Sequence, residues 1–295
     1  MPLYAPWLIL IPAYLLLWPP ATRRLALAGI AAGLALAAEN GQIDARALGT
    51  LALLGASAWA VSRSKARRLA SAAGDAKGAA LAPHAAWLVP AGHAVFVLTA
   101  IGLALHLLPG FHNTRVIDAV RLDPQAVPFT LYLNFDKPLI AAWIMVVLAP
   151  PCLGKSAGAT MRAALAAAAL ACALCLGLAW LLDYTHWAPH WPPEGAIWLL
   201  NNAVLVTLAE EAFFRGYVQQ RLTRKFGAAA ACIIAALLFG LAHWAGGPAM
   251  ITLATMAGLC YGWAYRQGGL AAAVLAHLAL NTAHFGLFVY PALAG

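Results

Sequence analysis

Residues 201–222, NNAVLVTLAEEAFFRGYVQQRL, decide which kind of protein this chain can be. The segment is apolar and long enough to cross a bilayer as one helix, because such a helix needs about 20 mostly apolar residues. Two adjacent carboxylates, Glu210 and Glu211, nevertheless lie near its middle. A charged side chain at the centre of a membrane helix costs roughly 2.5–3.5 kcal/mol on insertion scales and marks a functional site by default. We therefore expect a membrane helix that carries a polar site.

The rest of the chain has the same apolar character. Of its 295 residues, 63% are hydrophobic and only 9% are charged, and the mean hydropathy is +0.79. Soluble domains usually contain about 25% charged residues, so this composition argues against a water-soluble globular protein. The net charge of +8 is then a sign of membrane topology, and no nucleic-acid partner is expected.

About ten apolar segments follow one another along the chain, and because several early ones are short we expect eight to ten spans. They run approximately over 3–19, 25–38, 46–62, 84–108, 138–153, 160–182, 196–219, 227–245, 249–265 and 269–291. We predict an all-α fold, a polytopic membrane helix bundle of about ten transmembrane helices with its functional core in the last four. The one compositional boundary is near Pro192-Pro193, after which polar residues begin to appear inside the spans. This divides the chain into residues 1–190, N-terminal transmembrane helices of unknown role, and residues 191–295, the core.

Basic residues orient the predicted spans. They follow the odd-numbered segments, whereas the other loops are neutral or acidic. Because cytoplasmic loops carry the excess of Lys and Arg, both termini are predicted to be non-cytoplasmic. We expect a multi-pass protein of the cell membrane, specifically the bacterial inner membrane, with the lipid bilayer as a partner. The long connection from Gly110 to Lys137 is predicted to be a surface loop on the headgroups, with a re-entrant segment as the alternative.

Spacing along the last spans brings four polar side chains to one depth. Glu210 and His243 each lie about sixteen residues from the turn at Phe226-Gly227, so both are roughly 24 Å along neighbouring antiparallel helices. His277 and Asn281 are four residues apart, share a helix face and come within reach of the same layer. One carboxylate, two imidazoles and one amide are thus predicted to converge.

Three further polar residues lie near this predicted cluster. Glu211 and Arg215 are four apart, so they stack on one helix face and can form a structural ion pair. His284 continues the stripe of His277 and Asn281 at i+7, and its role is left open between packing and a direct contact.

The predicted cluster suits hydrolysis. A carboxylate beside an imidazole can hold a water molecule and take its proton. A second imidazole and a carboxamide N–H form a donor pair suited to an oxyanion. The same residue types could instead bind zinc. No H-E-x-x-H motif occurs and few candidate ligands share a helix, so we predict no metal and no cofactor and keep zinc as the alternative.

Three motifs on successive apolar helices resemble one family. E-E-A-F-F-R (210–215), F-G-L-A-H (239–243) and H-L-A-L-N (277–281) resemble the E-E-x-x-x-R, F-x-x-x-H and H-x-x-x-N signatures of the CPBP family. That family groups CAAX prenyl proteases of the Rce1 type with bacterial Abi relatives. The resemblance covers about residues 195–290, and three motifs in order are far more specific than any one alone.

The resemblance implies a role for each matched residue. Glu210 would be the catalytic glutamate that activates water with His243, and His277 and Asn281 would stabilise the oxyanion. The supporting residues would be Glu211, Arg215 and Phe239.

The resemblance also implies a glutamic-type intramembrane endopeptidase without an obligatory metal. Its expected substrate is a membrane-anchored protein or prepeptide, such as one with a C-terminal hydrophobic sorting tail. The alternatives are a proton-coupled membrane transporter and a catalytically silent immunity or scaffold protein.

Overall fold

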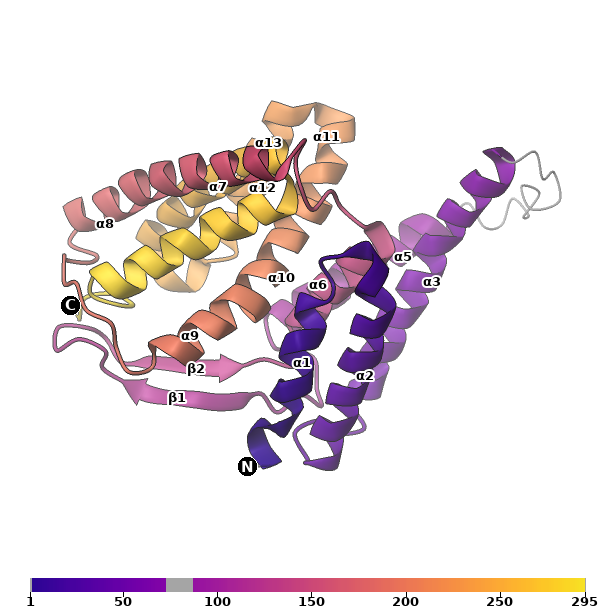
Figure 1. Cartoon of the computed structure of the whole chain (residues 1–295), viewed down its shortest axis with the longest axis horizontal. Helices are drawn as coiled ribbons and strands as arrows, with labels where there is room; N and C mark the ends of the chain where they lie inside the picture. The colour runs from indigo at the N-terminus through magenta and orange to yellow at the C-terminus, as the bar shows by residue number, and fades with distance from the viewer. Residues whose placement is uncertain (1, 73–86, 295) are drawn as a thin grey trace. The chain divides into compact units, whose positions relative to one another are not determined.

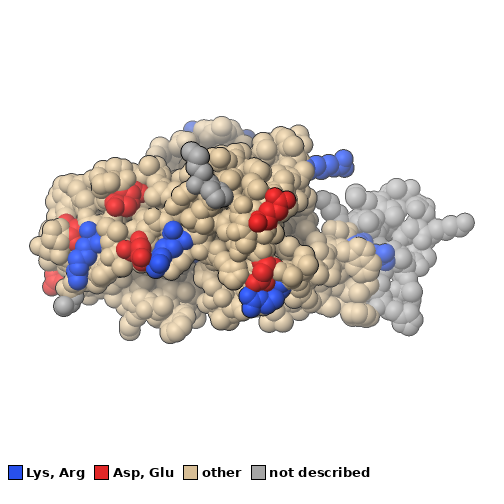
Figure 2. Space-filling view, turned by 90° about the horizontal axis from the view of Figure 1, so that it is seen from below, with Lys and Arg blue, Asp and Glu red and all other residues tan. Residues whose placement is uncertain are grey.

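The computed structural model describes residues 2–72 and 87–294, which are mostly helical with one two-stranded sheet (Figure 1). The predicted helical membrane protein is confirmed at this level, whereas the all-α assignment missed the sheet. The chain forms two compact units. Unit 1 comprises residues 1–113 and 135–148, and unit 2 comprises residues 114–134 and 149–295. Lys, Arg, Asp and Glu side chains are few and scattered on the face drawn in Figure 2, as the composition requires.

Unit 1 is built from helices of different lengths. They are η1 (Pro2–Tyr4), α1 (Ala5–Leu15), η2 (Pro20–Thr22), α2 (Arg23–Glu39), α3 (Ala47–Ala72), α5 (Leu88–Ala104), α6 (Pro138–Trp143) and the π-helical η4 (Ile144–Leu148). Trp143 of α6 packs against α5, because its ring stacks on Phe96 with 3.7 Å between ring centres. Its Nε1 donates to the Leu54 carbonyl at 3.1 Å and to Ser57 Oγ at 2.9 Å, so the buried indole is fully paired.

A large, open apolar cavity lies between helices of unit 1. Its volume is about 940 Å³, and its walls come from α2, α3, α6 and η4. Among the described residues, Asp44, between α2 and α3, is the one charged residue in its lining. Asp44 Oδ2 lies 2.6 Å from Arg46 Nη2 and 3.0 Å from His112 Nε2. The Arg46 guanidinium holds the pKa of the Asp44 carboxyl below its usual range.

Unit 2 contains the hairpin and the later helices. In chain order it has β1 (Thr114–Val120), β2 (Phe129–Leu133), α7 (Ala157–Ala171), π-helical η5 (Cys172–Leu176), α8 (Gly177–Leu181), α9 (Gly195–Asn201), π-helical η6 (Asn202–Val206), α10 (Thr207–Glu211), π-helical η7 (Ala212–Gln219), α11 (Gln220–Phe226), α12 (Ala228–Leu241), η8 (Trp244–Gly246) and α13 (Gly247–Leu287). Helix α7 packs along α13, as does α12 (Figure 1). The predicted boundary between residues 190 and 191 stays a prediction. Helices α7 and α8 precede that boundary and lie in the same unit as the residues after it.

The connection from Gly110 to Lys137 differs from its prediction as a surface loop. Strands β1 and β2 pair antiparallel within it, with register shifts at two points. Ile117 and Leu131 are buried with Trp198 and Phe285, so one face of the hairpin covers the end of the unit 2 helices. The polar–apolar alternation in this segment is the two-residue period of a half-buried strand.

In the described part of the chain, four helical stretches are long and apolar enough to cross a membrane. They cover residues 20–39, 157–181, 195–226 and 244–287, and α1, α5, α12 and the α6–η4 stretch are shorter apolar helices. Every predicted apolar segment overlaps one of the described helices, although residues 84–86 of one segment lie outside the described part. The count of ten spans and their orientation stay predictions.

Helix α13 contains a break at Gly269. This residue has φ 74° and ψ −171°, a conformation that glycine adopts readily and other residues do not. A Cβ there would lie 2.8 Å from backbone atoms of Cys152 and Leu153. The amides of Leu270 and Ala271 donate to the Pro151 and Cys152 carbonyls, so the second half starts as a new helix. The break falls at the start of the predicted segment 269–291.

Candidate active site

The helix over residues 195–226 changes type on both sides of the two glutamates. The π-helical η6 precedes α10, and the π-helical η7 follows it. The Thr207 hydroxyl donates to the Asn202 carbonyl at 2.8 Å and closes the first of these wide segments. π-helical turns are rare in proteins as a whole, and those that occur are often found at functional sites. They also rotate the glutamates relative to a regular α-helix, so spacing alone could not fix where each side chain points.

Glu211 lies at the centre of a buried charge network. Its Oε2 is 3.1 Å from Arg215 Nε, which is the ion pair that the spacing of four predicted, and both side chains are fully buried. Its Oε1 is 2.9 Å from Nδ1 of His277. The Arg215 guanidinium carbon lies 4.7 Å from the centre of the Phe239 ring, a cation–π contact. A buried carboxylate is tolerated because it is paired in this way.

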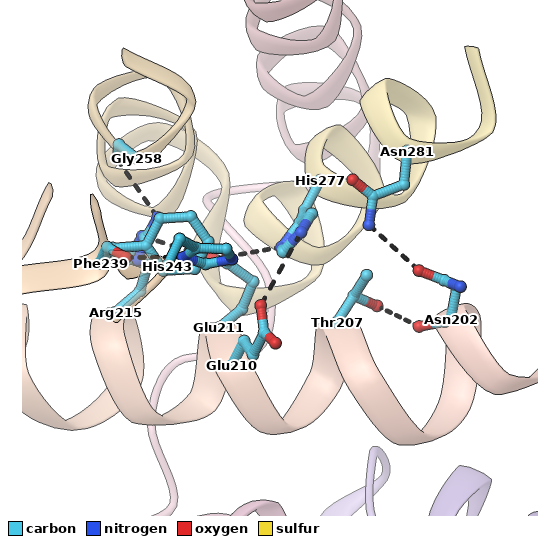
Figure 3. Close-up of polar contacts among 10 residues, drawn as sticks. All are labelled: Asn202, Thr207, Glu210, Glu211, Arg215, Phe239, His243, Gly258, His277 and Asn281. Carbon is cyan, nitrogen blue, oxygen red and sulfur yellow. Dashed lines mark hydrogen bonds and ion pairs between the residues drawn. The ribbon is translucent and has the colours of Figure 1, made fainter. Parts of the chain in front are cut away.

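His277 lies between two carboxylates (Figure 3). Its Nδ1 faces Glu211, and its Nε2 is 4.0 Å from Oε2 of Glu210. The hydrogen bond that one ring nitrogen makes decides the role of the other, so Nδ1–H donates to Glu211 and Nε2 faces Glu210. The structure therefore brings His277 and Glu210 together, as predicted from depth. The contact of His277 with Glu211 was not anticipated, because depth estimates do not resolve which of two adjacent glutamates a side chain meets.

His243 is held in a defined orientation at the end of α12. Its Nδ1 is 2.8 Å from the Phe239 carbonyl, to which it donates. In the neutral ring the lone pair is then on Nε2. The Phe239 ring packs against both imidazoles, at 4.6 Å from His243 and 5.7 Å from His277 between ring centres. Phe239 thus has the packing position that the motif implied.

The two histidines line one small cavity. Its volume is about 110 Å³, and Asn281 and His284 also line it, so three imidazoles and an amide share this space. The predicted convergence of His243, His277 and Asn281 is present in the structure. The predicted pairing of Glu210 with His243 stays a prediction.

Asn281 is oriented by a residue that the sequence analysis missed. Its Nδ2 donates to Oδ1 of Asn202 at 3.1 Å (Figure 3). Asn202 Nδ2 in turn donates to the Trp198 carbonyl at 3.1 Å. A carboxamide nitrogen has two hydrogens, so Asn281 retains one N–H for another acceptor. A signal was available, because Asn202 is a polar residue in an apolar span and lies eight residues before Glu210.

Tyr261 is a second residue that no motif indicated. Its ring stacks on His277 with 4.6 Å between centres and an interplanar angle of 16°. An aromatic residue in an apolar helix carries no signal that separates packing in the core from packing at a site.

The alternative of a zinc site was compared with the side chains of the described residues. Within residues 2–72 and 87–294, no group of three or more His, Cys, Asp or Glu side chains is placed to hold a metal ion. No residue is therefore assigned as a metal ligand, and metal dependence is a matter for experiment.

The fold and the site define a class of protein, a helical membrane protein with glutamate, histidine and asparagine side chains gathered inside one unit. Residues 192–283 match the family described as type II CAAX prenyl endopeptidase Rce1-like. All three motifs lie inside the matched residues, so the match covers the segment in which the motifs indicated the resemblance. No curated protein and no solved structure matches the chain.

Proposed function

We propose that this protein is a glutamic-type intramembrane endopeptidase. Its substrate would be a membrane-anchored protein or prepeptide, in particular one with a C-terminal hydrophobic sorting tail. The single observation that carries the proposal is the position of His277, between two carboxylates and on the wall of a cavity shared with His243 and Asn281. The family match and the four membrane-length helices support the same conclusion.

Glu210 and His243 would activate the attacking water. The 4.0 Å between Glu210 Oε2 and His277 Nε2 exceeds a direct hydrogen bond, and it suits a water bridging the two groups. The water oxygen forms a bond to the scissile carbonyl carbon while its proton passes to Glu210 or to His243 Nε2. The same group then gives that proton to the leaving amine as the C–N bond breaks, so the enzyme returns to its initial state.

Asn281 and His277 would stabilise the oxyanion. The second N–H of Asn281 supplies one donor, and Asn202 fixes the orientation of that amide. When both nitrogens of His277 carry protons, Nδ1–H stays on Glu211 and Nε2–H is offered to the oxyanion. Arg215 compensates the charge of Glu211 and so supports the ring from behind.

The decisive experiment is a cleavage assay in proteoliposomes on a panel of membrane-anchored peptides from the same genome. Glu210→Gln keeps the shape and removes the base, so we expect cleavage to fall by about 10²–10⁴-fold. Asp183→Asn is the matched control, because it makes the same acid-to-amide change at an exposed residue outside the site and should cleave normally.

Each arm of the assay can contradict the proposal. Normal cleavage by Glu210→Gln would disprove the assigned base. Loss of cleavage with a strong chelator and recovery with zinc would replace the mechanism by a metal-dependent one. Absence of cleavage together with pH-dependent flux would favour a proton-coupled transporter.

A further inference from the structure

The open apolar cavity of unit 1 is a groove that the proposed hydrolysis does not use. Helix α2 packs along α1, and helix α3 packs along α5. One helix of each pair, α2 and α3, lines the groove together with α6 and η4. Its volume of about 940 Å³ is that of a ligand site, because such sites usually enclose about 300–1,000 Å³.

The length of the groove matches one leaflet of a bilayer. Its lining extends from Leu27 to Ala38 along α2 and from Leu48 to Ala58 along α3. At 1.5 Å per residue, both stretches are about 15–17 Å long. The hydrocarbon core of a bilayer is about 30 Å thick, so one leaflet is about 15 Å deep. Helix α2 belongs to a stretch that is long and apolar enough to cross a membrane, and the groove therefore has the length of one extended acyl chain.

One end of the groove is charged. The loop between α2 and α3 contributes Gly41, Asp44 and Ala45 to the lining, and the exposed residues Glu39 and Arg46 lie beside them in the chain. Arg46 donates to the Asp44 carboxylate through Nη2 at 2.6 Å and through Nε at 3.1 Å. A guanidinium has five N–H groups, so this pairing fixes it in place and leaves three donors for another acceptor.

An apolar groove with a charged end suits an amphiphile, and the charges indicate which one. With His112 neutral, the two carboxylates of Glu39 and Asp44 accompany a single guanidinium at this end. A headgroup with only negative charge is therefore disfavoured. A phosphate next to a primary ammonium matches both signs, because the phosphate accepts from Arg46 and the ammonium donates to Glu39. A choline headgroup has no N–H to donate.

We propose that this groove binds a phosphatidylethanolamine molecule of the bilayer. One acyl chain lies between α2 and α3, the phosphate is on Arg46 and the ammonium is on Glu39. The Asp44 carboxylate holds the guanidinium in position before the lipid arrives, which reduces the entropy cost of binding. The site lies wholly in unit 1, so the inference does not depend on the proposed function.

The first test compares headgroups. Native mass spectrometry of the full chain, released from detergent, measures binding of phosphatidylethanolamine, phosphatidylcholine and phosphatidylglycerol with identical acyl chains. We expect phosphatidylethanolamine to bind at least fivefold more tightly than either of the others. Equal affinities for the three lipids, or tightest binding of another one, would overturn the proposal.

The second test fills the groove. Gly55 of α3 lines it, and a Cβ at this position would meet no heavy atom of the described residues within 4 Å. Gly55→Trp therefore places an indole in the groove without a clash, and we expect about tenfold weaker binding of phosphatidylethanolamine. Gly49→Trp is the matched control, because Gly49 lies in equally open surroundings on the same helix but is not part of the lining. Unchanged binding by Gly55→Trp, or equal losses in both variants, would contradict the proposal.

The third test concerns the ammonium and the alternative occupant. Glu39→Gln keeps the shape of the side chain and removes its charge, so binding of phosphatidylethanolamine should fall to the level of phosphatidylcholine, whose own binding stays unchanged. Full binding by Glu39→Gln would disprove the assigned contact. The same spectra report the oligomeric state. A wild-type dimer without lipid that Gly55→Trp separates into monomers would assign the groove to a second copy of the chain and overturn the proposal.

Discussion

Each of the two units of this protein has a cavity, and the two cavities differ in size and in lining. The one in unit 1 has a volume of about 940 Å³ and apolar walls with, among the described residues, a single charged residue, Asp44. The one in unit 2 has about 110 Å³ and is lined by three imidazoles and an amide. A large apolar pocket is the usual first hypothesis for an active site. Here the convergence of polar groups, and not the volume, locates the chemistry.

Ion pairs show the same contrast. Arg46 and Asp44 in unit 1 keep 64% and 34% of their side-chain surface exposed, whereas Arg215 and Glu211 in unit 2 keep none. An exposed pair is screened by water and contributes little to stability. When one partner of a buried pair is removed, the other charge stays buried without compensation, and this strongly destabilises the fold.

Removal of the buried cation should have the largest effect on stability. Arg215→Ala leaves Glu211 buried beside His277 without its compensating charge, so we expect a loss of about 3–5 kcal/mol in the free energy of unfolding. The measurement is denaturant-induced unfolding in a bilayer mimic. Arg46→Ala is the matched control in unit 1 and should leave the unfolding midpoint unchanged. Equal effects of the two variants would refute the contrast between the ion pairs.

The same enlargement placed in each cavity should give unequal results. Ala257 lines the small cavity and is 4% exposed, so Ala257→Leu adds atoms where little space exists. We expect it to cost about 1–3 kcal/mol of stability and to reduce cleavage. Ala58 lines the large cavity, and Ala58→Leu should fit there with a change within about 0.5 kcal/mol. A larger destabilisation by Ala58→Leu would mean that the cavity of unit 1 is not open to added volume.

The smallest expected effect concerns the residue that orients Asn281. Asn202→Ala removes the acceptor for Asn281 Nδ2 but keeps the Asn281 side chain, which is then no longer held in one orientation. We therefore expect kcat to fall about tenfold with KM unchanged. Asn201→Ala makes the same change one position earlier, about 100° around the helix, and should retain kcat. If the two variants lose the same activity, the effect is a general one on the helix and not on the orientation of Asn281.

The sequence predicted the positions of site residues well on regular α-helices and less well beside π-helical segments. Helical rise along α12 and the second half of α13 was enough to predict that His243, His277 and Asn281 converge. The same reasoning could not resolve Glu210 from Glu211, because η6 and η7 change the rotation per residue on either side of α10. The hairpin was missed although its alternation was visible, since only packing against Trp198 and Phe285 distinguishes a strand from a surface loop.

Composition, motif order and spacing by themselves determined that this is a helical membrane protein with an Rce1-like segment and which side chains gather in it. These properties depend on hydrophobic content and on local periodicity, and both can be read directly from the sequence. Tertiary structure alone decided that Glu211 takes Nδ1 of His277 and that Asn202 orients Asn281. Such contacts join residues from different helices at distances near 3 Å. Only the packed positions of the helices, which no local pattern encodes, set distances of that precision.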